Sequence, residues 1–136
     1  MRTKPLILLV DDDDNFLEIF GTKLSAAGFD IILGHGPAQG IELATAQLPD
    51  LVLMDIHMPV MTGTDAALAI KQGEITKDLK IAFLTSLKEP WPAIQGDHQK
   101  VSKELGMEDF LEKSDDLNVL VQKVEEILSR GMGMMG

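Results

Sequence analysis

Short apolar runs alternate with segments of helical periodicity along this chain, and this alternation restricts the fold more than any other feature. The runs of strand length cover residues 5–10, 30–33, 51–54, 80–84 and 108–112. Between and after them, helical patterns cover residues 16–27, 37–47 and 65–72, and further helices are expected from about 92 and from 117. Strands that alternate with helices in this way pair in parallel, with helices on both faces of the sheet. The sequence therefore predicts an α/β domain with a doubly wound, five-stranded parallel sheet.

Glycine and proline mark several ends of the expected helices. Gly28 stands where the first helix should end, Pro37 opens the second helix and Pro49 follows its last turn. The residues of this second helix that we expect to face the core are Ile41, Ala44 and Leu48. The stretch GHGPAQG around its start imitates a dinucleotide-binding loop. Because its proline removes an amide donor, we interpret the stretch as a turn.

Length and charge exclude several classes of protein. The 136 residues suffice for one domain, expected over residues 1–130, with 131–136 as a flexible Gly/Met tail. The formal net charge of −10 disfavours direct binding of nucleic acid, and the absence of cysteine excludes disulfides and thiolate metal sites. No run approaches the roughly 20 apolar residues of a membrane span. The short N-terminal run, followed by four aspartates, is unlike a signal peptide. We therefore expect a soluble, cytoplasmic protein.

Polar side chains follow four of the five expected strands, at the point where each strand ends. For five strands the flavodoxin-like order 2-1-3-4-5 is the natural candidate, and its ligand crevice lies outside the carboxyl ends of strands 1 and 3. Asp11 and Asp12 end the first run, and Asp55 ends the third. Thr85 ends the fourth run and Lys113 the fifth. The sequence thus predicts three carboxylates, a hydroxyl and an ammonium at one edge of the sheet.

This set of groups is typical of a phosphoryl-transfer site that contains a metal ion. Clustered carboxylates repel one another unless a cation joins them. Only oxygen ligands are available, which favours Mg²⁺ first and Mn²⁺ or Ca²⁺ next. Lys113 and Thr85 would then hold the oxygens of a phosphoryl group on an aspartate. Asp13 and Asp14 are better explained as acids that cap the first helix and favour its dipole.

The chain resembles the receiver domains of two-component response regulators over nearly its whole length. Four segments carry the resemblance, in the family's order: ILLVDDD, DLVLMDIHMPVMTG, FLTS and FLEKS. The resemblance implies that Asp55 accepts the phosphoryl group and takes part in the magnesium site. It also implies that Asp12 binds Mg²⁺ directly, that Asp11 reaches it through water, and that the backbone carbonyl of His57 is a ligand.

The resemblance further implies a conformational switch. Thr85 would move onto the phosphoryl group, Lys113 would form an ion pair with it, and Phe110 would rotate into the space left by Thr85. The surface around the fourth helix, the fifth strand and the fifth helix would then repack. Implied partners are a sensor histidine kinase or a phosphotransfer protein, and a downstream protein target or an absent effector domain. We expect a monomer or a weak phosphorylation-dependent dimer. We expect no enzyme activity beyond the domain's own phosphorylation and dephosphorylation.

Three features depart from the family's common pattern. Ser114 follows Lys113 where many receivers have proline, so we predict a trans peptide bond there. The stretch from Thr85 to Lys113 is longer than a compact receiver needs, and it contains Trp91, the only tryptophan. The switch aromatic is a phenylalanine, which cannot donate a hydrogen bond. None of these departures changes the phosphorylation chemistry directly.

Other classes of protein fit the sequence less well. A haloacid-dehalogenase-type phosphatase needs a second acid where His57 stands, and an EF-hand needs a glycine that no register from Asp11 to Glu18 supplies. The serious alternative is a receiver-like module that binds partners without being phosphorylated. The complete set of three acids, with Thr85 and Lys113, argues against it.

Overall fold

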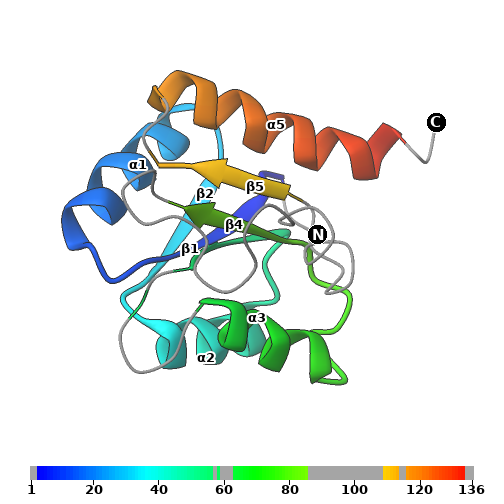
Figure 1. Ribbon diagram of the computed structural model, residues 1–136. Coiled ribbons are helices and arrows are strands. Elements are labelled where there is room, and N and C mark those ends of the chain that lie inside the picture. The colour runs from blue at the N-terminus through cyan, green and yellow to red at the C-terminus, as the bar shows by residue number, and fades with distance from the viewer. Residues whose placement is uncertain (1–2, 57, 59–62, 86–108, 114–115, 134–136) are drawn as a thin grey trace.

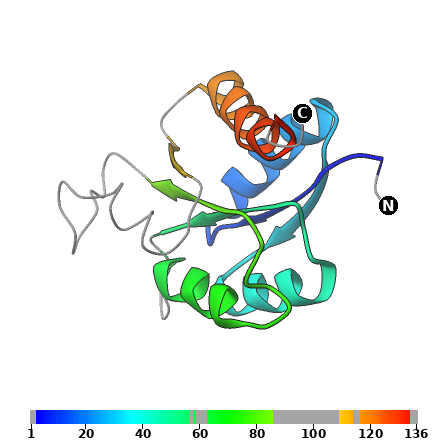
Figure 2. The same ribbon diagram turned by 90° about the vertical axis from the view of Figure 1, so that its right-hand side faces the viewer.

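A parallel sheet lies between two layers of helices in the computed structural model, which describes residues 3–56, 58, 63–85, 109–113 and 116–133 (Figure 1). Helices α1 (Asp14–Ala26) and α5 (Leu117–Gly133) cover one face of the sheet. Helices α2 (Pro37–Gln47) and α3 (Gly63–Gln72) cover the other (Figure 2). The prediction of helices on both faces is thereby confirmed.

The strand order is β2-β1-β3-β4-β5, and every neighbouring pair is parallel. The strands are β1 (Leu6–Val10), β2 (Asp30–Gly34), β3 (Leu51–Asp55), β4 (Ile81–Thr85) and β5 (Asp109–Glu112). The sequence pattern predicted this order, and it predicted each strand to within one residue at either end. The helix expected from about residue 92, Trp91 and the bond between Lys113 and Ser114 lie outside the described residues.

The central strands are buried because helices cover both of their faces. All five residues of β1 are buried, which explains why its sequence is uniformly apolar rather than alternating. Successive side chains of a strand point to opposite faces. Ile7 and Leu9 therefore pack in the core beneath α1 and α5, while Leu8 and Val10 pack in the core above α2 and α3.

Helix α1 ends in a Schellman motif. Gly28 has φ of +104°, a left-handed conformation that costs glycine little. Its N–H donates to the carbonyl of Ser25 over 3.1 Å, and the N–H of Phe29 donates to that of Leu24 over 3.2 Å. Leu24 and Phe29 are both buried, which supplies the hydrophobic contact that accompanies the motif. The predicted end of this helix at Gly28 is confirmed.

Helix α2 begins at Pro37 and ends at Gln47, as the sequence predicted. Ala44 is buried and Ile41 packs against the core as expected, but the prediction for Leu48 is wrong, because its side chain is 40% exposed. Leu48 is the C-cap and has φ of +47°, so it lies beyond the last helical turn and no longer follows the buried face of the helix. The chain between β2 and α2 bends at His35 and Gly36.

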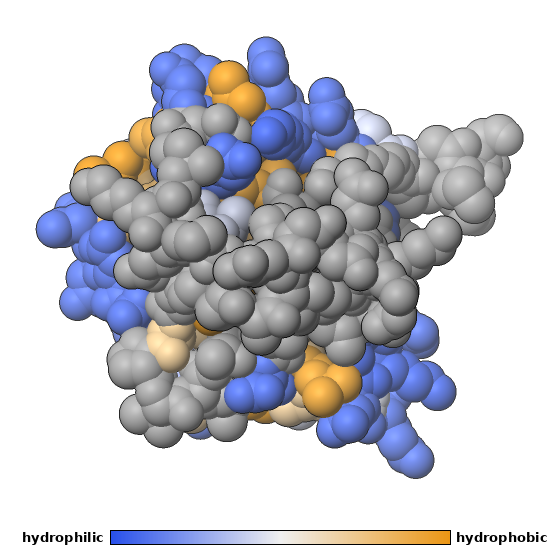
Figure 3. All heavy atoms as spheres, viewed as in Figure 1, coloured by the Kyte–Doolittle hydropathy of each residue, from blue (hydrophilic) through white to orange (hydrophobic). Residues whose placement is uncertain are grey.

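The C-terminal helix extends further than the sequence pattern indicated. Helix α5 runs to Gly133 and so includes the first three residues of the stretch 131–136; the last three lie outside the described residues. Within the described part of the chain, no helix combines the length and the apolar character that crossing a membrane requires. Hydrophilic residues cover much of the described surface over α1 and α5 in the view of Figure 3.

Candidate functional site

Three carboxylates gather at the carboxyl edge of the sheet. Strands β1 and β3 are neighbours in register, with Val10 opposite Met54, so the residues that follow, Asp11 and Asp55, reach the same edge. Asp11, Asp12 and Asp55 each offer a carboxylate oxygen, and these oxygens lie within 4.8 Å of one another. Asp11 and Asp55 are buried, whereas Asp12 is exposed. The structure thus brings together the three acids that the sequence selected.

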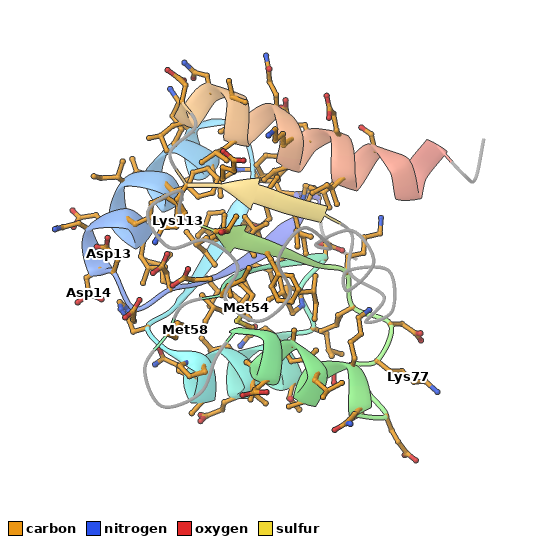
Figure 4. All side chains as sticks on the ribbon, viewed as in Figure 1. Asp13, Asp14, Met54, Met58, Lys77 and Lys113 are labelled. Carbon is orange, nitrogen blue, oxygen red and sulfur yellow. The ribbon has the colours of Figure 1, made fainter. Side chains whose placement is uncertain are left out.

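Lys113 supplies a positive charge to this cluster. Its backbone N–H donates to the carbonyl of Thr85 over 2.7 Å, which attaches the chain after β5 to the end of β4. Its Nζ lies 2.8 Å from Oδ2 of Asp11 and 4.6 Å from the ring centroid of Phe16. Figure 4 shows Lys113 above the start of α1, where Asp13 and Asp14 lie. The sequence indicated that Lys113 would reach the acids, but it gave no sign of the contact with Phe16.

Asp11 has few other partners. Its N–H donates to the carbonyl of Gly34 over 3.1 Å, and its Oδ1 accepts the N–H of Asp13 over 3.0 Å. Its Oδ2 is fully buried and has no partner in hydrogen-bond geometry among the described residues, although the Nζ of Lys113 lies 2.8 Å away. A buried carboxylate oxygen with unused lone pairs is suited to bind a cation.

Asp13 caps α1 and Asp14 lies in its first turn, so both acids belong to the start of the helix as the sequence indicated. Oδ1 of Asp13 accepts the N–H groups of Asn15 and Phe16 over 3.0 and 3.2 Å, which makes Asp13 the N-cap of α1. Asp14 lies in the first turn and forms an exposed pair with His35, with 2.7 Å between Oδ1 and Nδ1. Neither residue belongs to the three-carboxylate cluster.

Burial and charge shift the pKa values of the two partners in the ion pair. Burial raises the pKa of Asp11 above its usual value; contact with Lys113 and the N–H of Asp13 oppose this shift, and the charge of Asp12 adds to it. Burial alone would lower the pKa of Lys113. Contact with Asp11 and the charges of Asp55 and Asp13 outweigh burial, so the pKa of Lys113 is raised. The lysine therefore remains charged at neutral pH.

The remaining predicted site residues are described in part. Thr85 is the last residue of β4 and is buried. Because Asp55 pairs with Leu84, Thr85 is one residue further along at the same edge. The backbone of Phe110 lies in β5 opposite Phe83, but its side chain is outside the described structure, as is His57.

The cluster fits a hard divalent cation. Its ligands are all oxygens, as Mg²⁺ prefers, and the buried Oδ2 of Asp11 has spare acceptor capacity. Three ionised carboxylates and the ammonium of Lys113 leave two formal negative charges, which one divalent cation would neutralise. Asp11, Asp12 and Asp55 are the described residues that could hold it.

Comparison with known proteins identifies the family. Residues 7–125 match the family model of the response regulator receiver domain. This match spans most of the chain, and the chain therefore belongs to the response regulator receiver family. It is a receiver domain of the two-component type, as the sequence motifs predicted.

Curated relatives are transcriptional regulators of about twice this length. The transcriptional regulatory protein CpxR of Escherichia coli K12 is 32% identical over 124 residues, which cover 91% of this chain and 49% of that protein. The phosphate regulon transcriptional regulatory protein PhoB of Pseudomonas aeruginosa is 30% identical over 124 residues, which cover 91% of this chain and 52% of that protein. The chain thus spans about half the length of the curated relatives it matches.

Solved structures share the fold. A CheY-like receiver domain protein of Methanospirillum hungatei superposes with a TM-score of 0.82 at 20% identity, covering 97% of this chain and 99% of that one. The receiver domain of a sensor histidine kinase of Pseudomonas aeruginosa superposes with a TM-score of 0.77 at 27% identity, covering 93% and 99%. That structure has a magnesium ion coordinated in its active-site cleft.

Proposed function

We propose that Asp55 is the phosphoacceptor of this receiver domain and that the reaction requires Mg²⁺ held by Asp11, Asp12 and Asp55. One observation carries the proposal: the buried carboxyl of Asp55, at the end of β3, shares a cluster with two further carboxylates. The ammonium of Lys113 contacts that cluster through Asp11. From the resemblance to receiver domains we also assign the backbone carbonyl of His57 to the metal site.

The chemistry is transfer of a phosphoryl group to a carboxylate. An oxygen of Asp55 attacks phosphorus in line with the bond that breaks, and a mixed anhydride forms. With a phosphohistidine donor, the electron pair of the broken N–P bond stays on the imidazole, which gains one proton overall. Mg²⁺ held by these acids would neutralise charge on the carboxylates and on the transferring oxygens. Asp11 and Asp12 would hold the metal in the cluster to which Asp55 belongs.

Lys113 and Thr85 would stabilise the transferred group. Lys113 is charged at neutral pH and starts from Asp11, within the same cluster, so a short movement of its long side chain would reach oxygens on Asp55. Thr85 offers a hydroxyl, a donor that suits one of the three phosphoryl oxygens. We assign both residues to catalysis and Thr85 also to the switch.

The proposal also includes a conformational switch that extends from the site to β5 and α5. A phosphoryl group adds close to two negative charges at the ends of β1, β3 and β4. Movement of Thr85 toward it would free space for the side chain of Phe110, one strand away. The surface around β5 and α5, which in the family also includes the fourth helix, would then change shape and alter its affinity for a partner.

The partners follow from the reaction and from the relatives. The donor would be a histidine kinase, a phosphotransfer protein or a small acyl phosphate. The downstream target would be another protein or a further domain, because the curated relatives extend well beyond the matched region. The curated relatives are transcriptional regulators. A similar role for this protein would place the domain in the cytoplasm. We propose that the domain assists only its own phosphorylation and dephosphorylation and acts on no other substrate.

Incubation with acetyl phosphate and Mg²⁺ tests the assignment of Asp55. Intact mass should increase by one phosphoryl group in the wild-type protein and stay unchanged in Asp55→Asn. Asp78→Asn is the matched control, since Asp78 is an exposed acid in the loop after α3 and should leave incorporation intact. Incorporation into Asp55→Asn at the wild-type level would disprove the assignment.

A titration separates this function from a receiver-like module that only binds partners. Beryllofluoride with Mg²⁺ imitates an aspartyl phosphate without a covalent transfer. A phosphoacceptor site should bind it, with amide NMR shifts at the ends of β1, β3 and β4 that disappear in Asp55→Asn. A wild-type protein that neither binds beryllofluoride nor gains mass would favour the module without phosphorylation.

A further inference from the structure

An aromatic ring faces the site lysine. The Nζ of Lys113 lies 4.6 Å from the ring centroid of Phe16 and 2.8 Å from Oδ2 of Asp11. The ring face carries partial negative charge, so an ammonium at this distance is attracted to it. Because the side chain of Lys113 is only 18% exposed, water screens this attraction less than it would on an open surface.

Two contacts fix the position of Phe16. Its N–H donates to Oδ1 of Asp13 in the N-cap of α1. Its ring packs against that of Phe20, with centroids 5.4 Å apart and an interplanar angle of 42°. Phe20 is fully buried in the core. The ring therefore has a defined position before any ligand binds.

The contacts form a closed loop around the lysine. The N–H of Asp13 donates to Oδ1 of Asp11, whose other oxygen contacts Lys113. Lys113 contacts the ring of Phe16, and the N–H of Phe16 returns to Asp13. The start of α1 thus holds both the carboxylate and the aromatic face that together define where the ammonium lies.

We propose that Phe16 is a positioning residue for Lys113, because its ring confines the ammonium to the carboxylate cluster. The proposal rests on the proposed function of Lys113 in phosphoryl transfer. Lysine has a long stem with several rotatable bonds, and one ion pair leaves much of that freedom. The ring removes orientations that point to solvent. It gives the lysine a second contact in addition to the ion pair with Asp11.

A purely structural role for Phe16 would require a side chain that fills the space but not an aromatic ring. Phe16 packs against the core that contains Phe20, and a leucine would fill much of the same space. Positioning of Lys113 instead requires an aromatic face. Phe16→Leu and Phe16→Tyr therefore separate the two roles, since both keep a large side chain that can pack against the core and only the tyrosine keeps the ring.

Two measurements test the proposal. The first is the rate of phosphorylation by acetyl phosphate at saturating Mg²⁺, which should fall roughly three- to tenfold in Phe16→Leu and stay near wild type in Phe16→Tyr. The second is the NMR shift of the ε-methylene of Lys113 in metal-free protein. The ring current of Phe16 displaces this shift, and it should return toward the value of an unstructured lysine in Phe16→Leu alone.

Phe29→Leu is the matched control. Phe29 is a buried aromatic residue of the same core, but it precedes β2 and so lies at the opposite edge of the sheet from the site. It should lose stability without changing the rate or the lysine shift. Equal losses of rate in Phe16→Leu and Phe29→Leu, or an unchanged lysine shift in Phe16→Leu, would overturn the proposal. If the wild-type protein accepts no phosphoryl group, the proposed function fails, and the lysine shift still decides whether Phe16 holds Lys113.

Discussion

Lys113 is the residue on which the charge balance of the site depends. Its ammonium contacts the buried Asp11 and also feels the charges of Asp55 and Asp13. Taking a charge out of water is unfavourable, and a buried pair offsets this only while both partners are present. Removing the lysine would leave the buried Oδ2 of Asp11 without its ion-pair partner. The fold should therefore depend on this residue when no metal is bound.

We predict that Lys113→Met destabilises the metal-free protein by about 1–3 kcal/mol at neutral pH. The pKa of Lys113 is raised in the folded state, so its contribution is fully present below the unfolded value near 10.5 and is lost as pH rises through the folded value. The difference between the two proteins should thus be steady from neutral to mildly alkaline pH and shrink at higher pH. Urea unfolding in the presence of a chelator measures it.

Lys77→Met provides the control for this experiment. Lys77 is exposed in the loop after α3, on the far side of the molecule from the site in Figure 4. Its replacement should change stability by less than about 0.5 kcal/mol at any pH. A difference for Lys113→Met that stays the same, or grows, above the unfolded pKa would show that the lysine does not stabilise the fold through its charge.

The sequence identified most of these residues but not all of their contacts. Residues at strand ends could be assigned to one edge because parallel strands all end on the same side. The pairing of Lys113 with Asp11, and the ring of Phe16 beside them, depends on how side chains from distant segments meet. Helical periodicity placed Phe16 on the inward side of α1, but a repeat pattern carries no information about which residue of another element lies opposite.

At the scale of the elements, apolar pattern and turn residues account for most boundaries. Short runs without polar residues are typical of strands covered on both faces, and Gly28 and Pro37 limited two helices by their backbone preferences. Leu48 was misassigned because periodicity continues past the last hydrogen-bonded turn, whereas the backbone there is left-handed. The pattern did not predict the extension of α5 to Gly133, because the glycine-rich residues there have no apolar periodicity.

The packing of α2 on β1 is close enough to require glycine at position 40. A Cβ there would lie 2.9 Å from both Cγ atoms of Val10. We predict that Gly40→Ala destabilises the protein by about 1–2 kcal/mol, because overpacking costs about 1–3 kcal/mol and the better helix propensity of alanine returns about 0.5–1 kcal/mol. Urea unfolding measures the change.

A double-mutant cycle identifies Val10 as the cause. With Val10→Ala in the background the overlap is gone, so Gly40→Ala should become neutral or stabilising. Strictly additive effects of the two substitutions would contradict the proposed contact.

At the scale of the whole molecule, charge opposes folding. The chain has 22 acidic and 12 basic residues, with a net charge of −10, and it also places three carboxylates together at one edge of the sheet. General self-repulsion is screened by any salt. Repulsion within the cluster differs, because two of its acids are buried and a cation has to enter the site to relieve it. The two effects are therefore separable by experiment.

We predict that Mg²⁺ raises the melting temperature beyond the effect of KCl at equal ionic strength. A ligand that binds only the native state at one hundred times its Kd stabilises by about 2.7 kcal/mol, which corresponds to roughly 10 °C for a domain of this size. Asp12→Asn should raise the melting temperature of the metal-free protein by relieving repulsion, yet lose most of the response to Mg²⁺. Asp14→Asn should keep the full response, since Asp14 lies outside the cluster and pairs with His35. A rise that KCl reproduces, or one that Asp12→Asn retains in full, would mean that Mg²⁺ screens the surface instead of occupying the three-carboxylate site.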